Sequence, residues 1–230
     1  VAALTKLADE LRLLRHSFAA KGREFREVLK VGRTQLQDAV PMTLGQEFRG
    51  FSTTLGEDID RIEDVRPLLM ELNLGATAIG TGITAPPGYG DAVIGHLREI
   101  TGFEELVIAD DLIEATSDTG VFMSTSSVMK RTAMKLSKIC NDLRLLSSGP
   151  QAGLGEIVLP AVQAGSSIMP GKVNPVIPEA VNQVAFVIAG SDVTIAMASE
   201  AGQLQLNAFE PVMAHVLLQN STWLRRAART

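Results

Sequence analysis

Apolar residues recur at alternating steps of three and four in the first part of the chain, which is the spacing of one helix face. This spacing predicts a long amphipathic helix over residues 1–30. The stripe consists of Leu4, Leu7, Leu11, Leu14, Phe18, Phe25 and Val28, with one break at Lys21.

A second stripe begins after Thr43 and predicts a helix over residues 43–74. Its members are Leu44, Phe48, Phe51, Leu55, Ile59 and Ile62. Thr43 is a typical N-cap residue, and Glu47 lies near the first turn, where a negative charge is favourable. We expect Pro67 to kink or interrupt this helix, because proline has no backbone N–H to donate.

Similar patterns predict three more long helices, over residues 112–146, 179–200 and 211–226, and a short one over 91–101. The helix over 112–146 ends at Ser147-Ser148-Gly149-Pro150. It keeps the three-and-four spacing at Met129, Ala133, Leu136, Cys140 and Leu143. Between the helices lie a glycine- and threonine-rich segment, 75–90, and a loop over 153–175. No run alternates convincingly as a strand, apart from short stretches such as 156–159.

The predicted fold class is therefore all-α, a bundle of long helices. The helices over 179–200 and 211–226 are apolar on more than one face, so one chain does not cover them. We expect copies of the chain to pack together into a symmetric oligomer.

Composition limits the classes of partner. Hydrophobic residues make up 46% of the 230 residues, enough for a sizeable core, and the net charge of −5 comes from interspersed charges. No basic patch indicates nucleic acid or a membrane surface, and Asp192 interrupts the most apolar stretch, so we expect neither partner. The single cysteine, Cys140, fits a small core residue in a reducing, cytoplasmic compartment.

The chain begins without methionine, inside a helical repeat, and its last residues are still compatible with a helix. We interpret residues 1–230 as one central helical domain that is a piece of a longer protein.

The segment Gly165–Pro175 has the composition of an active-site loop. It places Ser166, Ser167, Lys172 and Asn174 between glycines and prolines. Glycines allow hinge motion, and a lysine and an asparagine can bind a carboxylate. An ordinary surface loop with helix-capping serines fits the same composition equally well.

A second polar stretch, Gly32–Pro41, links the first two predicted helices. Thr34, Gln35 and Gln37 can line a site for a polar anion, although composition alone favours helix-end capping. The glycines of residues 75–82 do not form a nucleotide site, since they follow no strand and lack the Gly-Lys-Ser/Thr ending. The three histidines are widely separated with no ligand spacing, so we expect no metal site.

Two of these stretches resemble signature regions of the aspartase/fumarase superfamily. Gly165-Ser-Ser-Ile-Met-Pro-Gly-Lys-Val-Asn-Pro175 is similar to its signature loop, and Gly32-Arg-Thr-Gln-Leu-Gln-Asp-Ala-Val-Pro-Met-Thr-Leu-Gly-Gln46 is similar to its second signature region. The resemblance extends over essentially the whole chain. It implies a homotetramer with a multi-helix core, in which segments of three subunits build each active site.

The resemblance also implies roles for individual residues. Ser166 would be the general base, and Ser167, Lys172 and Asn174 would hold a carboxylate of a small dicarboxylate substrate. Thr34 and Gln35 match positions that face the substrate, and Glu179 matches a carboxylate that supports the site. The superfamily's N-terminal signature region and its C-terminal domain are not among these residues, so this segment alone is not expected to hold a complete active site.

The implied activity is elimination of ammonia from L-aspartate to give fumarate, without a required cofactor. The alternative is the hydration of fumarate by a class II fumarase, which typically has histidine where Gln35 stands. Asp111–Asp118 and Leu204-Gln205-Leu206 look like the ammonia-lyase branch. A non-catalytic helical core, as in lens proteins of the superfamily, is the second alternative, but Ser166, Lys172 and Asn174 are all present.

Overall fold

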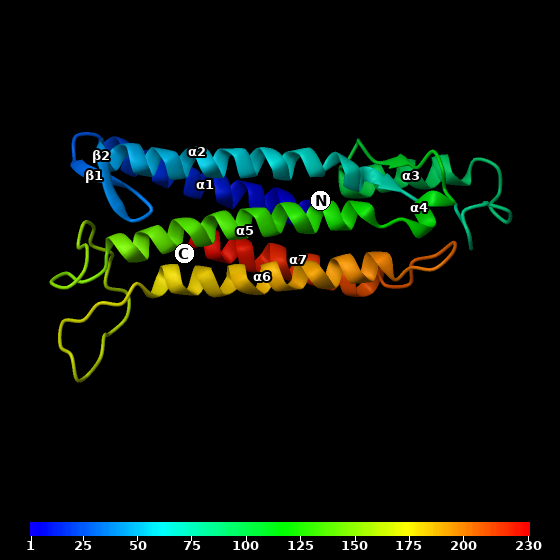
Figure 1. Ribbon diagram of the computed structural model, residues 1–230. Coiled ribbons are helices and arrows are strands. Elements are labelled where there is room, and N and C mark those ends of the chain that lie inside the picture. The colour runs from blue at the N-terminus through cyan, green and yellow to red at the C-terminus, as the bar shows by residue number, and fades with distance from the viewer.

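The computed structural model describes residues 1–230 and is dominated by five long helices lying side by side (Figure 1). They are α1 (Ala2–Glu24), α2 (Leu44–Val65), α5 (Gly120–Leu146), α6 (Val176–Glu200) and α7 (Glu210–Arg229). Each of the predicted long helices is present, which confirms the helical bundle.

The main core lies between these five helices and consists of 17 buried residues. The predicted stripes supply most of it: Leu4, Leu7, Leu11, Leu55, Ile59, Ile62, Met129, Ala133, Leu136 and Cys140. A smaller aromatic cluster contains Phe18, Phe48 and Phe51, whose rings meet in tilted and edge-to-face pairs. This cluster fixes the start of α2 against α1.

The N-terminus of α2 agrees with the sequence prediction. Thr43 Oγ1 accepts a hydrogen bond from the N–H of Gln46 at 3.1 Å, and the Gln46 side chain accepts one from the N–H of Thr43 at 2.9 Å. The pair forms a capping box. At the other end the predicted bound of residue 74 was wrong, because α2 stops at Val65. Pro67 interrupts the helix as expected and begins the 3₁₀ helix η1 (Pro67–Met70), but the α-helix does not resume, since residues 71–72 form a strand.

The prediction of one helix over residues 1–30 with a polar link after it was wrong beyond Glu24. Residues 29–43 form an antiparallel hairpin, β1 (Leu29–Thr34) and β2 (Gln37–Thr43). Helices α1 and α2 approach closely beside this hairpin, where a Cβ on Gly45 would lie 2.5 Å from the Gly22 carbonyl oxygen. Val28, predicted on the helix stripe, is 47% exposed.

The prediction over residues 112–146 also needs correction, since the helix is broken. The short helix α4 (Glu114–Ser117) ends before α5 begins at Gly120. Buried Thr119 donates its hydroxyl to Ser199 Oγ of α6 at 2.8 Å, so a tertiary contact holds the break. The run 156–159, which looked strand-like, pairs with no strand.

The remaining elements form a small subdomain at the far end of the bundle from the hairpin (Figure 1). The expected short helix is α3 (Tyr89–Thr101), and β3 (Glu71–Leu72) pairs in parallel with β4 (Val107–Ile108).

Helix α6 is long and apolar enough, by length and composition alone, to cross a membrane. Asp192 lies within this helix and does not by itself exclude a membrane span, contrary to the prediction from the sequence. In the structure Asp192 pairs with Lys130 of α5 and accepts a hydrogen bond from Ser126 Oγ at 2.7 Å. Helix α6 packs along α5 and α7, as a core helix of a bundle does.

Candidate active site

Thr34 and Gln35 lie at the tip of the hairpin. Thr34 pairs with Gln37, so Gln35 and Leu36 are the two central residues of the turn, with φ of 53° and 63°. Two successive left-handed residues are typical of a type I′ turn, where asparagine and glycine are usual. Glutamine and leucine are strained in this conformation, and such strain is often found at functional sites. The side chains of Thr34 and Gln35 are exposed.

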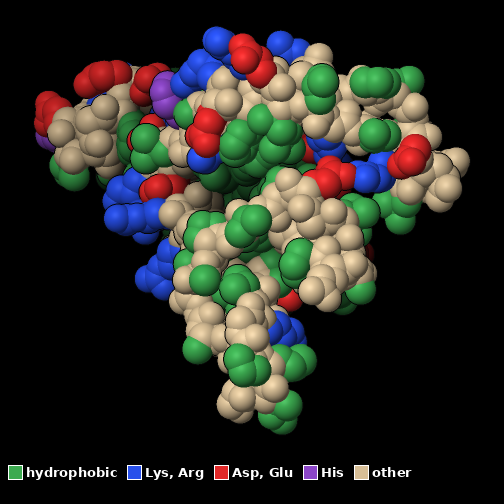
Figure 2. Space-filling model, turned by 90° about the vertical axis from the view of Figure 1, so that its left-hand side faces the viewer, with side chains coloured by type: hydrophobic (Ala, Val, Ile, Leu, Met, Phe, Trp, Pro, Cys, Tyr) green, Lys and Arg blue, Asp and Glu red, His purple; other side chains and the backbone are tan.

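Ser166, Ser167, Lys172 and Asn174 lie on the loop between α5 and α6. This loop extends beyond the end of the bundle (Figure 1) and forms the narrow lower projection in the end-on view of Figure 2. A Cβ on Gly165 would lie 1.9 Å from the carbonyl oxygen of Lys172, so the two ends of this small loop meet. The N–H of Ile168 donates to Ser166 Oγ at 3.1 Å. The side chains of Ser167, Lys172 and Asn174 make no hydrogen bond or ion pair within the chain, so their donors are available to a ligand.

Glu179 lies in the first turn of α6, and its carboxylate is 3.8 Å from Arg144 Nη2 of α5. The same arginine donates to Asn182 Oδ1 at 3.3 Å, and buried Asn182 donates to Ser137 Oγ at 2.7 Å. These contacts tie the start of α6 to α5. They fix the point where the loop that carries Ser166 returns to the bundle.

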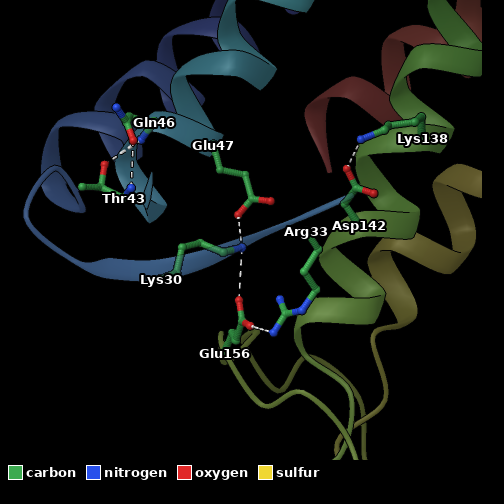
Figure 3. Close-up of polar contacts among 8 residues, drawn as sticks. All are labelled: Lys30, Arg33, Thr43, Gln46, Glu47, Lys138, Asp142 and Glu156. Carbon is green, nitrogen blue, oxygen red and sulfur yellow. Dashed lines mark hydrogen bonds and ion pairs between the residues drawn. The ribbon is translucent and has the colours of Figure 1, made fainter. Parts of the chain in front are cut away.

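A row of ion pairs with alternating charges, not predicted from the sequence, joins the hairpin to the other end of this loop (Figure 3). Lys30 of β1 forms ion pairs with Glu47 of α2 at 2.7 Å and with Glu156 at 3.1 Å, and Arg33 pairs with the other oxygen of Glu156. The bond from Arg33, together with Lys30, lowers the pKa of Glu156 below its ordinary value. The ion pairs of Glu156 join residues more than a hundred positions apart and have no local sequence signal, so this set of ion pairs was not predictable.

A groove of about 320 Å³ lies beside these charges, between the hairpin and the last turns of α5. Gln35 and Leu36 line it on the hairpin side, and Lys138 and Asp142 line it on the helix side. A second groove, of about 340 Å³, is apolar and lies between α6 and α7 around Trp223, with none of the candidate residues. The candidate chemistry is therefore concentrated at the hairpin end of the bundle.

The structure brings the predicted residues to one end of the bundle but does not join them (Figure 1). No hydrogen bond or ion pair connects Thr34 or Gln35 with Ser166, Ser167, Lys172 or Asn174 within the chain. Three His, Cys, Asp or Glu side chains at ligand distance, which a metal ion would need, are not found together.

The chain is similar to known lyases over most of its length. A family model described as Lyase matches residues 1–190. The chain is 63% identical to an aspartate ammonia-lyase of Pseudomonas fluorescens over 222 residues, which cover 96% of this chain and 46% of that protein. It is 58% identical to the aspartate ammonia-lyase of Escherichia coli strain K12, covering 94% of this chain and 45% of that protein. The chain thus spans about half the length of the curated relatives it matches.

Solved structures agree with these matches. A cobalt-bound protein from Brucella melitensis, described as a fumarate lyase:delta crystallin, superposes with a TM-score of 0.96 at 56% identity. The match covers 99% of this chain and 49% of that one. A class II fumarase from Schistosoma mansoni superposes with a TM-score of 0.93 at 36% identity, covering 99% of this chain and 51% of the fumarase.

Proposed function

The chain belongs to the lyase family of the aspartases and class II fumarases, and on that premise we propose that the whole protein converts L-aspartate to fumarate and ammonia. The observation that carries the proposal is the difference in identity between the two branches. The aspartate ammonia-lyases of Pseudomonas fluorescens and Escherichia coli match at 63% and 58%, whereas the class II fumarase of Schistosoma mansoni matches at 36% over nearly the same region.

The reaction needs a base on one side of the substrate and fixed donors on the other. Ser166 takes the proton from C3, and the electrons of that C–H bond move into the carboxylate bonded to C3. This carboxylate then carries two negative oxygens, which positive and N–H groups stabilise. The electrons next form the C2–C3 double bond, and ammonia leaves C2 with the electrons of the C–N bond. Lys172, Asn174 and Ser167 are the donors we assign to this task.

The neutral hydroxyl of a serine is a weak base, so the site must stabilise the alkoxide form that takes the proton. The hydrogen bond from the Ile168 N–H to Ser166 Oγ supports this role, because an N–H donor stabilises the charged form of the oxygen. Closure of the loop over substrate would remove water and strengthen these interactions. We assign Thr34 and Gln35 to the opposite side of the substrate, and Glu179 to support of the loop at α6.

We also propose that the active protein is a homotetramer whose sites are shared between subunits. The support is the apolar surface of α6, where four large side chains are between 48% and 66% exposed: Phe186, Val187, Val193 and Met197. A helix this apolar on its outer side needs a partner in water. Sharing of sites fits the separation of Gln35 from Ser166 within the chain.

No cofactor is required in this proposal, since the residues named supply the base and the donors. The buried free thiol of Cys140 fits a reducing compartment, so we place the enzyme in the cytoplasm.

The test is an absorbance assay for fumarate, run on the whole protein with L-aspartate and L-malate in parallel, followed by light scattering for the oligomeric state. Rapid fumarate formation from aspartate supports the proposal. Fumarate from malate alone would assign the protein to the fumarases, and the absence of either reaction would favour a non-catalytic core.

A further inference from the structure

Glu156 is the last residue before the loop that carries Ser166 whose side chain makes a polar contact with a distant part of the chain. Its carboxylate binds Lys30 and Arg33 of β1. Its N–H donates to the Leu146 carbonyl at 2.8 Å, and the N–H of Ile157 donates to the same oxygen at 3.3 Å. The next residue, Ile157, packs against the aromatic cluster. From residue 158 to residue 175, every hydrogen bond is local to the loop or to the start of α6.

The ion pairs of Glu156 are partly shielded from water. The side chain of Lys30 is 8% exposed, and those of Glu156 and Arg33 are 21% and 22% exposed. Pairs in such surroundings are screened less than surface pairs, and removing one partner leaves a charge that is hard to compensate. Lys30 is also held by Glu47 from α2, so the contact links α2, β1 and the loop in one chain of charges (Figure 3).

One carboxylate reaches two cations of the same strand. Lys30 and Arg33 are three positions apart on β1, and both contact Glu156. The pairing of β1 with β2 shifts register between them, where Gly32 lies opposite both Ala39 and Val40 of β2. Arg33 directly precedes Thr34 and Gln35, so the contact lies next to the residues assigned to the substrate.

We propose that Glu156 is a positioning residue that locks the stem of the Ser166 loop to the hairpin that carries Thr34 and Gln35. The inference rests on the proposed function, because it assigns substrate contacts to both segments. Glu156 touches no substrate. It sets the place from which the loop extends, and a misplacement of about 1 Å in such a segment lowers turnover.

The experiment uses the whole protein with four changes: Glu156→Gln, Glu156→Asp, Arg33→Gln and the double variant Glu156→Gln/Arg33→Gln. The matched control is Asp142→Asn, which removes a carboxylate beside the same groove but one that pairs with Lys138 on its own helix. The midpoint of thermal unfolding of each variant is measured first. If Glu156→Gln does not assemble, Glu156→Asp and Arg33→Gln carry the comparison.

Two readouts are expected to move together. kcat/KM for L-aspartate falls about tenfold in Glu156→Gln, falls less in Glu156→Asp, which keeps the charge, and stays within about twofold in Asp142→Asn. kcat/KM of the double variant falls no further than that of the more impaired single variant, because both changes break the same contact. Cleavage by trypsin after exposed Lys172, followed by mass spectrometry, becomes several-fold faster in Glu156→Gln and not in Asp142→Asn.

The trypsin readout separates this inference from the proposed function, since it needs no activity. Faster cleavage at Lys172 in a protein that does not deaminate aspartate would support the lock and refute the proposed reaction. Unchanged cleavage in Glu156→Gln, or kinetic effects that add in the double variant, would overturn the lock even in an active aspartate ammonia-lyase.

Discussion

Gly165 lies directly against the main-chain carbonyl of Lys172, so closely that a Cβ at residue 165 would be 1.9 Å from that oxygen. The contact closes the loop on itself, so that Ser166 and Lys172 lie at its two meeting ends. The base and the cation of the proposed mechanism therefore belong to one small folded unit.

The first prediction is that Gly165→Ala impairs catalysis without affecting the bundle. The added methyl group must open the loop, so we expect kcat/KM for L-aspartate to fall by at least about tenfold. The midpoint of thermal unfolding should change little, because the loop lies outside the core. Gly50→Ala is the control: a Cβ there meets nothing within 4 Å, and alanine favours a helix. An active Gly165→Ala variant would show that the closed loop is not needed.

The second prediction concerns the base. Ser166→Ala should lower kcat by about a thousandfold or more while the oligomer remains intact, because Ser166 lies on a projecting loop. Ser17→Ala, on the exposed side of α1, should have no effect. Steady-state kinetics and light scattering measure the two properties. Turnover within about tenfold of the unchanged protein would mean that another group takes the proton.

The third prediction separates Lys172 from Ser166. Lys172→Ala should raise KM strongly and also lower kcat, since the lost charge weakens binding of both the substrate and the transition state. Lys138→Ala removes an exposed lysine that pairs only with Asp142 and serves as the control. If KM for aspartate is unchanged in Lys172→Ala, the lysine does not hold a substrate carboxylate.

The long helices were predictable because their signals are local. The apolar stripe of α2, its N-cap at Thr43 and its end before Pro67 all follow from residues within a few turns. The hairpin was not predictable in the same way. Its turn is Gln35-Leu36, where asparagine and glycine would be the usual signal, and the register shift opposite Gly32 interrupts the alternation of faces in β2.

The candidate site also contains both residues that local sequence indicates and contacts that it does not indicate. Ser166, Lys172 and Asn174 could be selected by composition and resemblance, because they lie within one short segment. The contact of Glu156 with Lys30 joins residues far apart in the sequence, and only the packing of the loop against β1 brings them together. The assembly of Gln35 with Ser166 is not found within the chain and stays a prediction.

The fourth prediction concerns a buried carboxylate in the bundle. Asp58 of α2 is fully buried, and neither of its oxygens has a hydrogen bond, although Arg131 Nε lies at 3.3 Å and Lys135 Nζ at 4.0 Å. Burial raises the pKa of Asp58, and the two cations oppose this only in part. The folded state thus favours the protonated form, and its stability declines as the pH rises through the pKa of Asp58.

Asp58→Asn should therefore raise the midpoint of thermal unfolding at pH 7 by about 2 °C. The difference from the unchanged protein should shrink toward zero as the pH is lowered below the ordinary pKa of an aspartate, where Asp58 is protonated in both the folded and the unfolded state. Asp60→Asn, on the exposed side of the same helix, should show no such pattern. A lower midpoint for Asp58→Asn at pH 7 would mean that the cations stabilise the carboxylate more than burial destabilises it.

The last prediction concerns the leaving group, on which the two branches of the family differ. Ammonia departs readily from a protonated amine, so an enzyme that acts on aspartate needs no strong acid on that side of the substrate. A neutral hydrogen-bonding side chain such as Gln35 is sufficient there. Hydroxide is a poorer leaving group and needs a proton as it departs, which histidine can supply near neutral pH.

The whole protein should therefore have a kcat/KM for L-aspartate at least about a hundredfold above that for L-malate, a difference of about 3 kcal/mol between the two transition states. Gln35→His should narrow this ratio by adding a proton donor, and histidine tolerates the left-handed backbone of residue 35 better than most side chains do. Gln37→His is the matched control, because Gln37 lies across the same turn, opposite Thr34. A malate value equal to or above the aspartate value in the unchanged protein would assign it to the fumarases. A ratio that shifts equally in both histidine variants would show that Gln35 does not face the leaving group.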